Sequence, residues 1–63
     1  MKKFRVYENQ SKLLTETDDY TEAVKQMKGA HKQNPDKFHE LYQLTDDQYI
    51  GIRQYKPGDK VRW

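Results

Sequence analysis

Apolar residues recur at helical spacing between residues 18 and 33, whereas the segments before and after alternate apolar and polar positions as strands do. The first two alternating segments are separated by Asn9, Gln10 and Ser11, which are typical turn residues and predict a hairpin. The expected strands are residues 4–7, 12–16, 38–44, 49–55 and 60–63. The pattern therefore predicts a small α+β fold with the element order ββαβββ, in which one helix packs on one face of a small antiparallel sheet.

The predicted helix has clear start and stop signals. Asp19 lies three residues before Glu22, the spacing of a capping box in which each of the two side chains binds a free amide of the first turn. Asn34 and Pro35 follow the last apolar position and end the helix. The apolar stripe predicted to face the sheet consists of Tyr20, Ala23, Val24, Met27, Ala30 and His31.

Residues 36–45 leave two interpretations open. A helical period is also met by Phe38, Leu41, Tyr42 and Thr45. We favour a strand, because a polar turn cluster at 45–48 is followed by residues 49–55, whose β-branched and aromatic side chains suit a pleated partner. Beyond them, Pro57 and Gly58 predict a type II turn that leads into the short fifth strand.

Strand alternation predicts which face of the sheet meets the helix. The side chains expected to point toward the helix are Phe4, Val6, Ile50, Ile52, Val61 and Trp63. Val24 and Met27 of the helix are expected to be buried against three of them, Val6, Ile50 and Ile52. The same alternation gathers tyrosines and cations on the opposite face. This predicted recognition face consists of Arg5, Tyr7, Tyr49, Arg53, Tyr55 and Arg62.

The composition indicates a single folded domain over residues 1–63 with a modest core, because a chain of this length buries only about 60% of its surface. Hydrophobic residues make up 33% of the chain and include five tyrosines, two phenylalanines and one tryptophan, which bury large areas. There is no cysteine, and no apolar run follows Lys2 and Lys3. We therefore expect a cytoplasmic protein without disulfides, signal peptide or membrane contact.

Nothing in the sequence predicts catalysis. His31 and His39 do not form a metal signature without cysteine, and the chain has neither a phosphate loop nor a nucleophile elbow. Asp18, Asp19 and Glu22 are explained by helix capping. We expect no enzyme activity, no catalytic residue, no metal, no cofactor and no small-molecule substrate.

The predicted function is that of a small non-catalytic protein-interaction module. It would bind a protein partner, or a second copy of itself, through its sheet face or a free strand edge. The alternative is a nucleic-acid-binding accessory protein, since tyrosines stack on bases and arginines pair with phosphates. The net charge of +2 is too small to favour this alternative, and tyrosine and arginine are also ordinary residues on a half-exposed strand.

Overall fold

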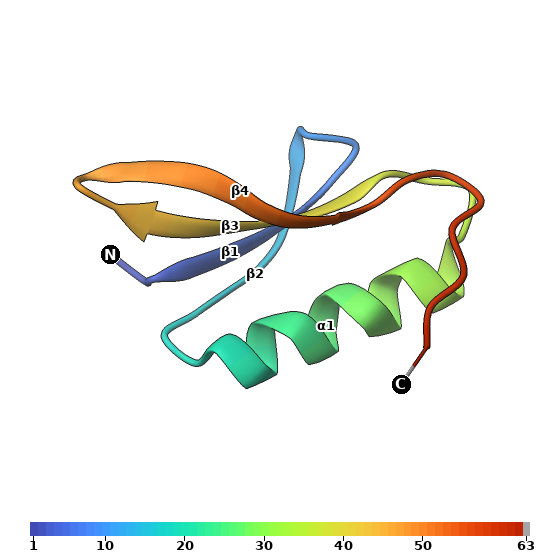
Figure 1. Ribbon diagram of the computed structural model, residues 1–63, viewed down its shortest axis with the longest axis horizontal. Helices are drawn as coiled ribbons and strands as arrows, with labels where there is room; N and C mark the ends of the chain where they lie inside the picture. The colour runs from blue at the N-terminus through green and yellow to red at the C-terminus, as the bar shows by residue number, and fades with distance from the viewer. Residues whose placement is uncertain (63) are drawn as a thin grey trace.

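A four-stranded antiparallel sheet and one helix make up the computed structural model of the protein, which describes residues 1–62 (Figure 1). The elements are β1 (Phe4–Glu8), β2 (Lys12–Thr17), α1 (Tyr20–Gln33), β3 (His39–Thr45) and β4 (Gln48–Tyr55). The strand order in the sheet is β2-β1-β3-β4, and every pair is antiparallel. The α+β class is confirmed, while the order within the described residues is ββαββ rather than ββαβββ.

Both hairpin turns place two successive residues in the left-handed region. Asn9 and Gln10, with φ of 53° and 63°, join β1 to β2. Asp46 and Asp47, with φ of 50° and 63°, join β3 to β4. Two positive φ values are typical of the type I′ turn, whose twist matches that of the flanking strands. At three of the four positions, Asn9, Asp46 and Asp47, a short polar side chain tolerates this conformation. The strand interpretation of β3 is confirmed.

The helix begins at the predicted cap. The Asp19 carboxylate accepts hydrogen bonds from the amides of Thr21 at 2.9 Å and Glu22 at 3.5 Å. The reciprocal half of the capping box does not form, because the Asp19 amide donates to the Thr17 hydroxyl at 3.1 Å. Glu22 instead accepts a hydrogen bond from the Gln26 amide group at 2.8 Å. The cap is therefore one-sided, and Thr17 supplies the acceptor that Glu22 was expected to provide.

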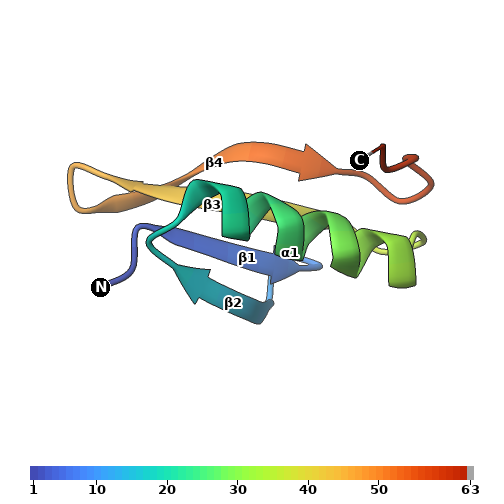
Figure 2. The ribbon, with the colours of Figure 1, turned by 90° about the horizontal axis from the view of Figure 1, so that it is seen from below.

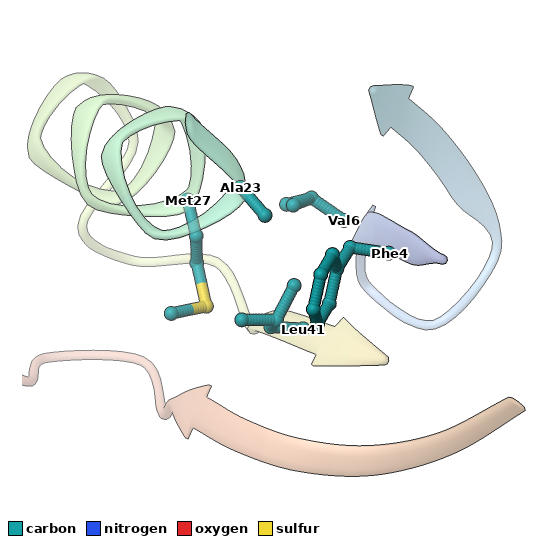
Figure 3. Packing of buried hydrophobic residues seen from close by; sticks show 5 residues of the cluster. All are labelled: Phe4, Val6, Ala23, Met27 and Leu41. Atoms are coloured by element: carbon teal, nitrogen blue, oxygen red, sulfur yellow. The ribbon is translucent and has the colours of Figure 1, made fainter. Parts of the chain in front are cut away.

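The helix lies across β1, β2 and β3 on one face of the sheet (Figure 2). Figure 3 shows the core that this packing creates, in which two helix residues meet residues of β1 and β3. Its members are Phe4, Val6, Ala23, Met27 and Leu41. Met27 is completely buried, as predicted, while Val24 is only half-buried at the margin of the core.

The predicted burial of two isoleucines on β4 is wrong. Ile50 is 48% exposed and Ile52 is 44% exposed, because the helix covers the other three strands and leaves β4 at the margin of the sheet. Met27 thus shares the core with residues of β1 and β3 instead of with the two isoleucines of β4.

A bulge in β4 changes the direction of its later side chains. Leu41 pairs with Arg53 and Tyr42 pairs with Gly51, so Ile52 has no partner on β3. An unpaired residue shifts the alternation of the strand by one position. From Arg53 onward, the residues predicted to face away from the helix therefore share a face with Leu41, which belongs to the core.

The turn after β4 forms as predicted. Gly58 has a φ of 89°, and the Asp59 amide donates to the Lys56 carbonyl at 2.9 Å, as a type II turn requires. The Gly58 amide also donates to the Pro35 carbonyl at 2.7 Å. This hydrogen bond ties the turn to the end of α1.

The fifth strand predicted at 60–63 is absent from residues 60–62, the part of it that the structure describes. Residues 60–62 are irregular, Val61 is half-buried outside any strand, and Trp63 lies outside the described residues. The turn directs this segment back beside the C-terminal half of α1, whereas a fifth strand would have to follow the free edge of β4 (Figure 1).

Three polar residues lie within the hydrophobic layer between helix and sheet. Glu8 is 6% exposed, and His31 and His39 are fully buried. All buried polar side-chain atoms within residues 1–62 have hydrogen-bond partners. The layer therefore contains a buried polar cluster beside its apolar core.

Candidate interaction face

The face of the sheet that the helix leaves open carries three tyrosines and one arginine. Arg5 and Tyr7 come from β1, Tyr42 from β3 and Tyr49 from β4. The strand register brings them together, since Arg5 is paired with Tyr42, and Tyr49 is paired with Leu44 two residues further along β3. We call Arg5, Tyr7, Tyr42 and Tyr49 the tyrosine face. All four side chains are half-buried, so their flat surfaces remain partly accessible.

Arg5 is the centre of the contacts on this face. Its guanidinium carbon lies 4.1 Å from the centroid of the Tyr49 ring, a cation–π distance. Its Nε donates to the Glu16 carboxylate at 3.0 Å, and a terminal nitrogen reaches the Tyr7 hydroxyl at 3.5 Å. Desolvation alone would lower the pKa of Arg5, but the hydrogen bonds to Glu16 and Tyr7 outweigh it and raise that pKa. The positive charge is therefore already paired within the face.

Tyr42 contributes a second set of contacts. Its ring meets Tyr7 edge to face, with centroids 5.4 Å apart and an interplanar angle of 89°. Its hydroxyl donates to the Glu40 carboxylate at 2.5 Å. This hydrogen bond, together with burial, raises the pKa of Tyr42 to about 12. A shallow hollow of about 250 Å³ opens between Tyr7, Gln10, Tyr42 and Tyr49.

The structure divides the predicted recognition face. Arg5, Tyr7 and Tyr49 lie together on the open face, as expected. Arg53 and Tyr55 lie on the helix side instead, because the bulge at Ile52 shifts the alternation before them.

The contacts of these two residues confirm their new position. Arg53 hydrogen-bonds to the hydroxyls of Tyr20 and Tyr55, which raises its pKa, and Tyr20 belongs to α1. Tyr55 packs at the edge of the core. Arg62 is exposed in the irregular segment after β4 and belongs to no strand.

Two kinds of residue on the open face were not identified from the sequence. Tyr42 was placed on a strand but not on a face, although it directly follows the buried Leu41 and must point the other way. The carboxylates of Glu16 and Glu40 lie beside the aromatic rings and bind Arg5 and Tyr42. The contact of Glu16 with Arg5 crosses two strands and cannot be read from the sequence of one strand. Glu40 lies two residues before Tyr42 on β3, a spacing that places both side chains on one face.

Other kinds of site receive no support from the described residues. Residues 1–62 contain no group of three or more His, Asp or Glu side chains that could hold a metal ion. No helix in the same part of the chain is long and apolar enough to cross a membrane. Comparison with known proteins found no matching family model, curated protein or solved structure. The functional argument therefore depends on the geometry of the chain.

Proposed function

We propose that the protein is a small non-catalytic module that binds another protein through the tyrosine face. One observation carries this proposal: three tyrosine rings and an arginine are gathered on the uncovered face of the sheet. Tyrosine and arginine are enriched at protein interfaces and among their strongest contact residues. The rings are already held by contacts with one another, so little side-chain freedom would be lost on binding.

The charges on the face favour a partner of a particular chemistry. Arg5 is paired with Glu16, and Glu40 adds a second carboxylate beside Tyr42. A partner segment with apolar side chains and a lysine or arginine would place apolar groups on the rings and its cation near these carboxylates. The proposed partner is therefore a protein surface that is apolar and basic.

A single-stranded nucleic acid is the second candidate, because three open tyrosine rings on a sheet also offer stacking platforms for bases. The neighbouring carboxylates weaken this candidate, since both repel phosphates and one of them, Glu16, binds Arg5. Salt dependence separates the two. Affinity for a nucleic acid falls steeply with salt, whereas an apolar protein contact is much less sensitive.

The free edge of β4 is another surface through which a protein, including a second copy of this chain, would bind. β4 is the last strand of the sheet, and Ile50 and Ile52 on it are exposed. Unpaired strand edges pair readily with other chains. A test of the tyrosine face must therefore include a change on this edge.

The test begins with the immobilised protein and native lysate, with and without nuclease. A retained partner is then purified, and its affinity is measured for Tyr49→Ala, Tyr49→Phe and Ile52→Lys. We expect Tyr49→Ala to weaken binding by about 2 kcal/mol, as an interface hot spot does, and Tyr49→Phe to retain most of the affinity because it keeps the ring.

The control distinguishes the two surfaces. Ile52→Lys should bind the partner as well as the unmodified protein does. If Ile52→Lys abolishes binding or causes a dimer to dissociate while Tyr49→Ala has no effect, the β4 edge is the interface and the proposal is wrong. Loss of retention after nuclease treatment would support the nucleic acid instead.

A further inference from the structure

A chain of hydrogen bonds runs through the buried layer from the C-terminal turn to β1. The Nε2 atom of His31 lies 2.9 Å from the Asp59 carbonyl oxygen. The Nδ1 atoms of His31 and His39 are 2.7 Å apart, and the Nε2 atom of His39 is 3.1 Å from a Glu8 carboxylate oxygen. The chain thus links the segment after β4, the helix, β3 and β1 through three contacts.

The partners at each end determine how many protons the chain holds. A carbonyl only accepts, so His31 Nε2 must donate to Asp59. The Glu8 carboxylate also accepts, so His39 Nε2 must donate to it. The contact between the two Nδ1 atoms needs one further proton. The two imidazole rings therefore carry three N–H protons. Two neutral rings carry only two, so the pair shares one positive charge.

The surroundings of Glu8 favour the ionised form on which this count depends. Burial alone would raise the pKa of Glu8, but the hydrogen bond from His39 and the charges of Lys37, His39 and Lys12 outweigh it, so the pKa is lowered. The Lys37 ammonium lies 3.7 Å from the other Glu8 oxygen. Glu8 thus remains a carboxylate beside the shared charge.

The other groups around the pair are compatible with one positive charge. The Tyr55 ring is stacked on His31, with centroids 5.1 Å apart and an interplanar angle of 20°, and offers a π face to the imidazole. The Asp59 carboxylate accepts from the Lys56 amide at 2.8 Å within its own turn. Asp59 therefore approaches the pair through its carbonyl.

We propose that the shared proton between His31 and His39 acts as a latch that holds the C-terminal turn, residues 56–59, on the helix. Each of the three contacts in the chain uses one of the three N–H protons. A fourth proton would place two donors against each other, and loss of one would leave two acceptors facing. Because β3 and β1 fix His39 through Glu8, the His31 ring must turn, and its Nε2 atom then leaves the Asp59 carbonyl.

The latch makes stability depend on pH in both directions. In the unfolded chain the two rings are independent, so together they carry four N–H protons in acid and two in alkali. The folded pair carries three. Stability therefore rises with pH on the acid side, where the unfolded chain binds more protons, and falls with pH on the alkaline side. The contribution of the pair is therefore largest between the acid and the alkaline range.

NMR of the unmodified protein tests the latch directly. At about pH 6.5 the ring nitrogen signals of His31 and His39 should show three N–H groups on two rings. The Gly58 amide, which donates to Pro35, should be most protected from hydrogen exchange near this pH. Its protection factor should fall at least tenfold toward about pH 4.5 and about pH 8.5, while amides between β1 and β3 change much less.

Two variants extend the test. His39→Gln removes the shared proton and should abolish the pH dependence of Gly58 protection. Lys25→Gln removes an exposed helix charge that is not part of the hydrogen-bond chain and should leave this pH dependence intact. The latch is refuted if His31 and His39 carry two N–H groups in total near neutral pH, or if Gly58 protection does not change with pH. These measurements on the unmodified protein decide the matter even if His39→Gln fails to fold.

Discussion

Polar side chains differ in burial and in contacts between the two faces of the sheet. On the covered face, three polar side chains are deeply buried, and these residues, His31, His39 and Glu8, form one continuous chain of hydrogen bonds. On the open face, aromatic and charged side chains alternate at half exposure. Their contacts join partly accessible side chains at the surface, such as Arg5 with Tyr49 and Tyr42 with Glu40.

The difference follows from the cost of burial. A buried polar atom without a partner is expensive, so polar groups under the helix persist only in a fully satisfied network. On the open face water satisfies any unpaired group, and pairing there restricts motion more than it stabilises the fold. The covered face therefore determines folding, while the open face can change with little effect on it. Substitutions on the two faces test this distinction.

Met27→Ala should have the largest effect, because Met27 is completely buried between helix and sheet. We expect a loss of about 2 to 5 kcal/mol in the free energy of unfolding, from lost apolar contact and the cavity left behind. Denaturant titration measures it. The control is Ile52→Ala on the exposed bulge, which should cost about 0.5 kcal/mol or less. Equal effects of the two changes would show that β4 belongs to the core.

Asp19→Ala should have the next largest effect, because Asp19 begins the helix that covers the sheet. Its carboxylate accepts from the amides of Thr21 and Glu22, and loss of such a cap costs about 0.5 to 2 kcal/mol. Asp19→Asn is the matched control, since it keeps an acceptor and should cost only a few tenths. A similar loss in both variants would indicate a role of charge rather than of the cap.

The sequence predicted the features that depend on neighbouring residues. Local spacing predicts the Asp19 cap, the turn at Gly58 and the placement of Arg5 and Tyr7 on the same face of the sheet. The bulge at Ile52 does not, because it arises from how β4 pairs with β3. That single unpaired residue moved Arg53 and Tyr55 to the other face.

The sequence contains part of the information needed to predict the buried chain of hydrogen bonds. Glu8 follows Phe4 and Val6 at the same alternation, His39 precedes Leu41 by two residues, and His31 follows Met27 by one helical turn. Their spacing from core residues therefore indicates that each of these three side chains points toward the core. Their contact depends on three elements meeting in space, so the chain of hydrogen bonds could not be inferred from the sequence.

On the open face, Glu40→Gln should have a larger effect on the titration of Tyr42 than on the free energy of unfolding. The hydrogen bond to Glu40 is the main reason that the pKa of Tyr42 is raised to about 12. Because the folded pKa lies above the unfolded value of about 10, Tyr42 stabilises the fold below about pH 10 and loses this contribution as pH rises to about 12. Without the Glu40 charge, the pKa should fall toward about 10. Absorbance of the tyrosinate measures it, with Tyr42→Phe identifying the signal.

Gly51→Ala should produce the smallest effect on stability. Gly51 lacks a positive φ, so alanine fits its backbone and restricts the unfolded chain, which alone would stabilise by about 0.4 to 1 kcal/mol. The added methyl group would lie 2.7 Å from a Glu40 carboxylate oxygen, which must therefore move. We expect these effects to offset each other to within about 1 kcal/mol.

The same substitution should nevertheless alter the open face. When Glu40 moves, its hydrogen bond to Tyr42 lengthens, and the pKa of Tyr42 should fall part of the way from about 12 toward its ordinary value. Gly29→Ala is the matched control, because nothing lies within 4 Å of the added methyl group and Gly29 is on the helix. It should stabilise by about 0.5 to 1 kcal/mol and leave Tyr42 unchanged. An unchanged Tyr42 titration in Gly51→Ala would mean that Glu40 can move aside while keeping its hydrogen bond.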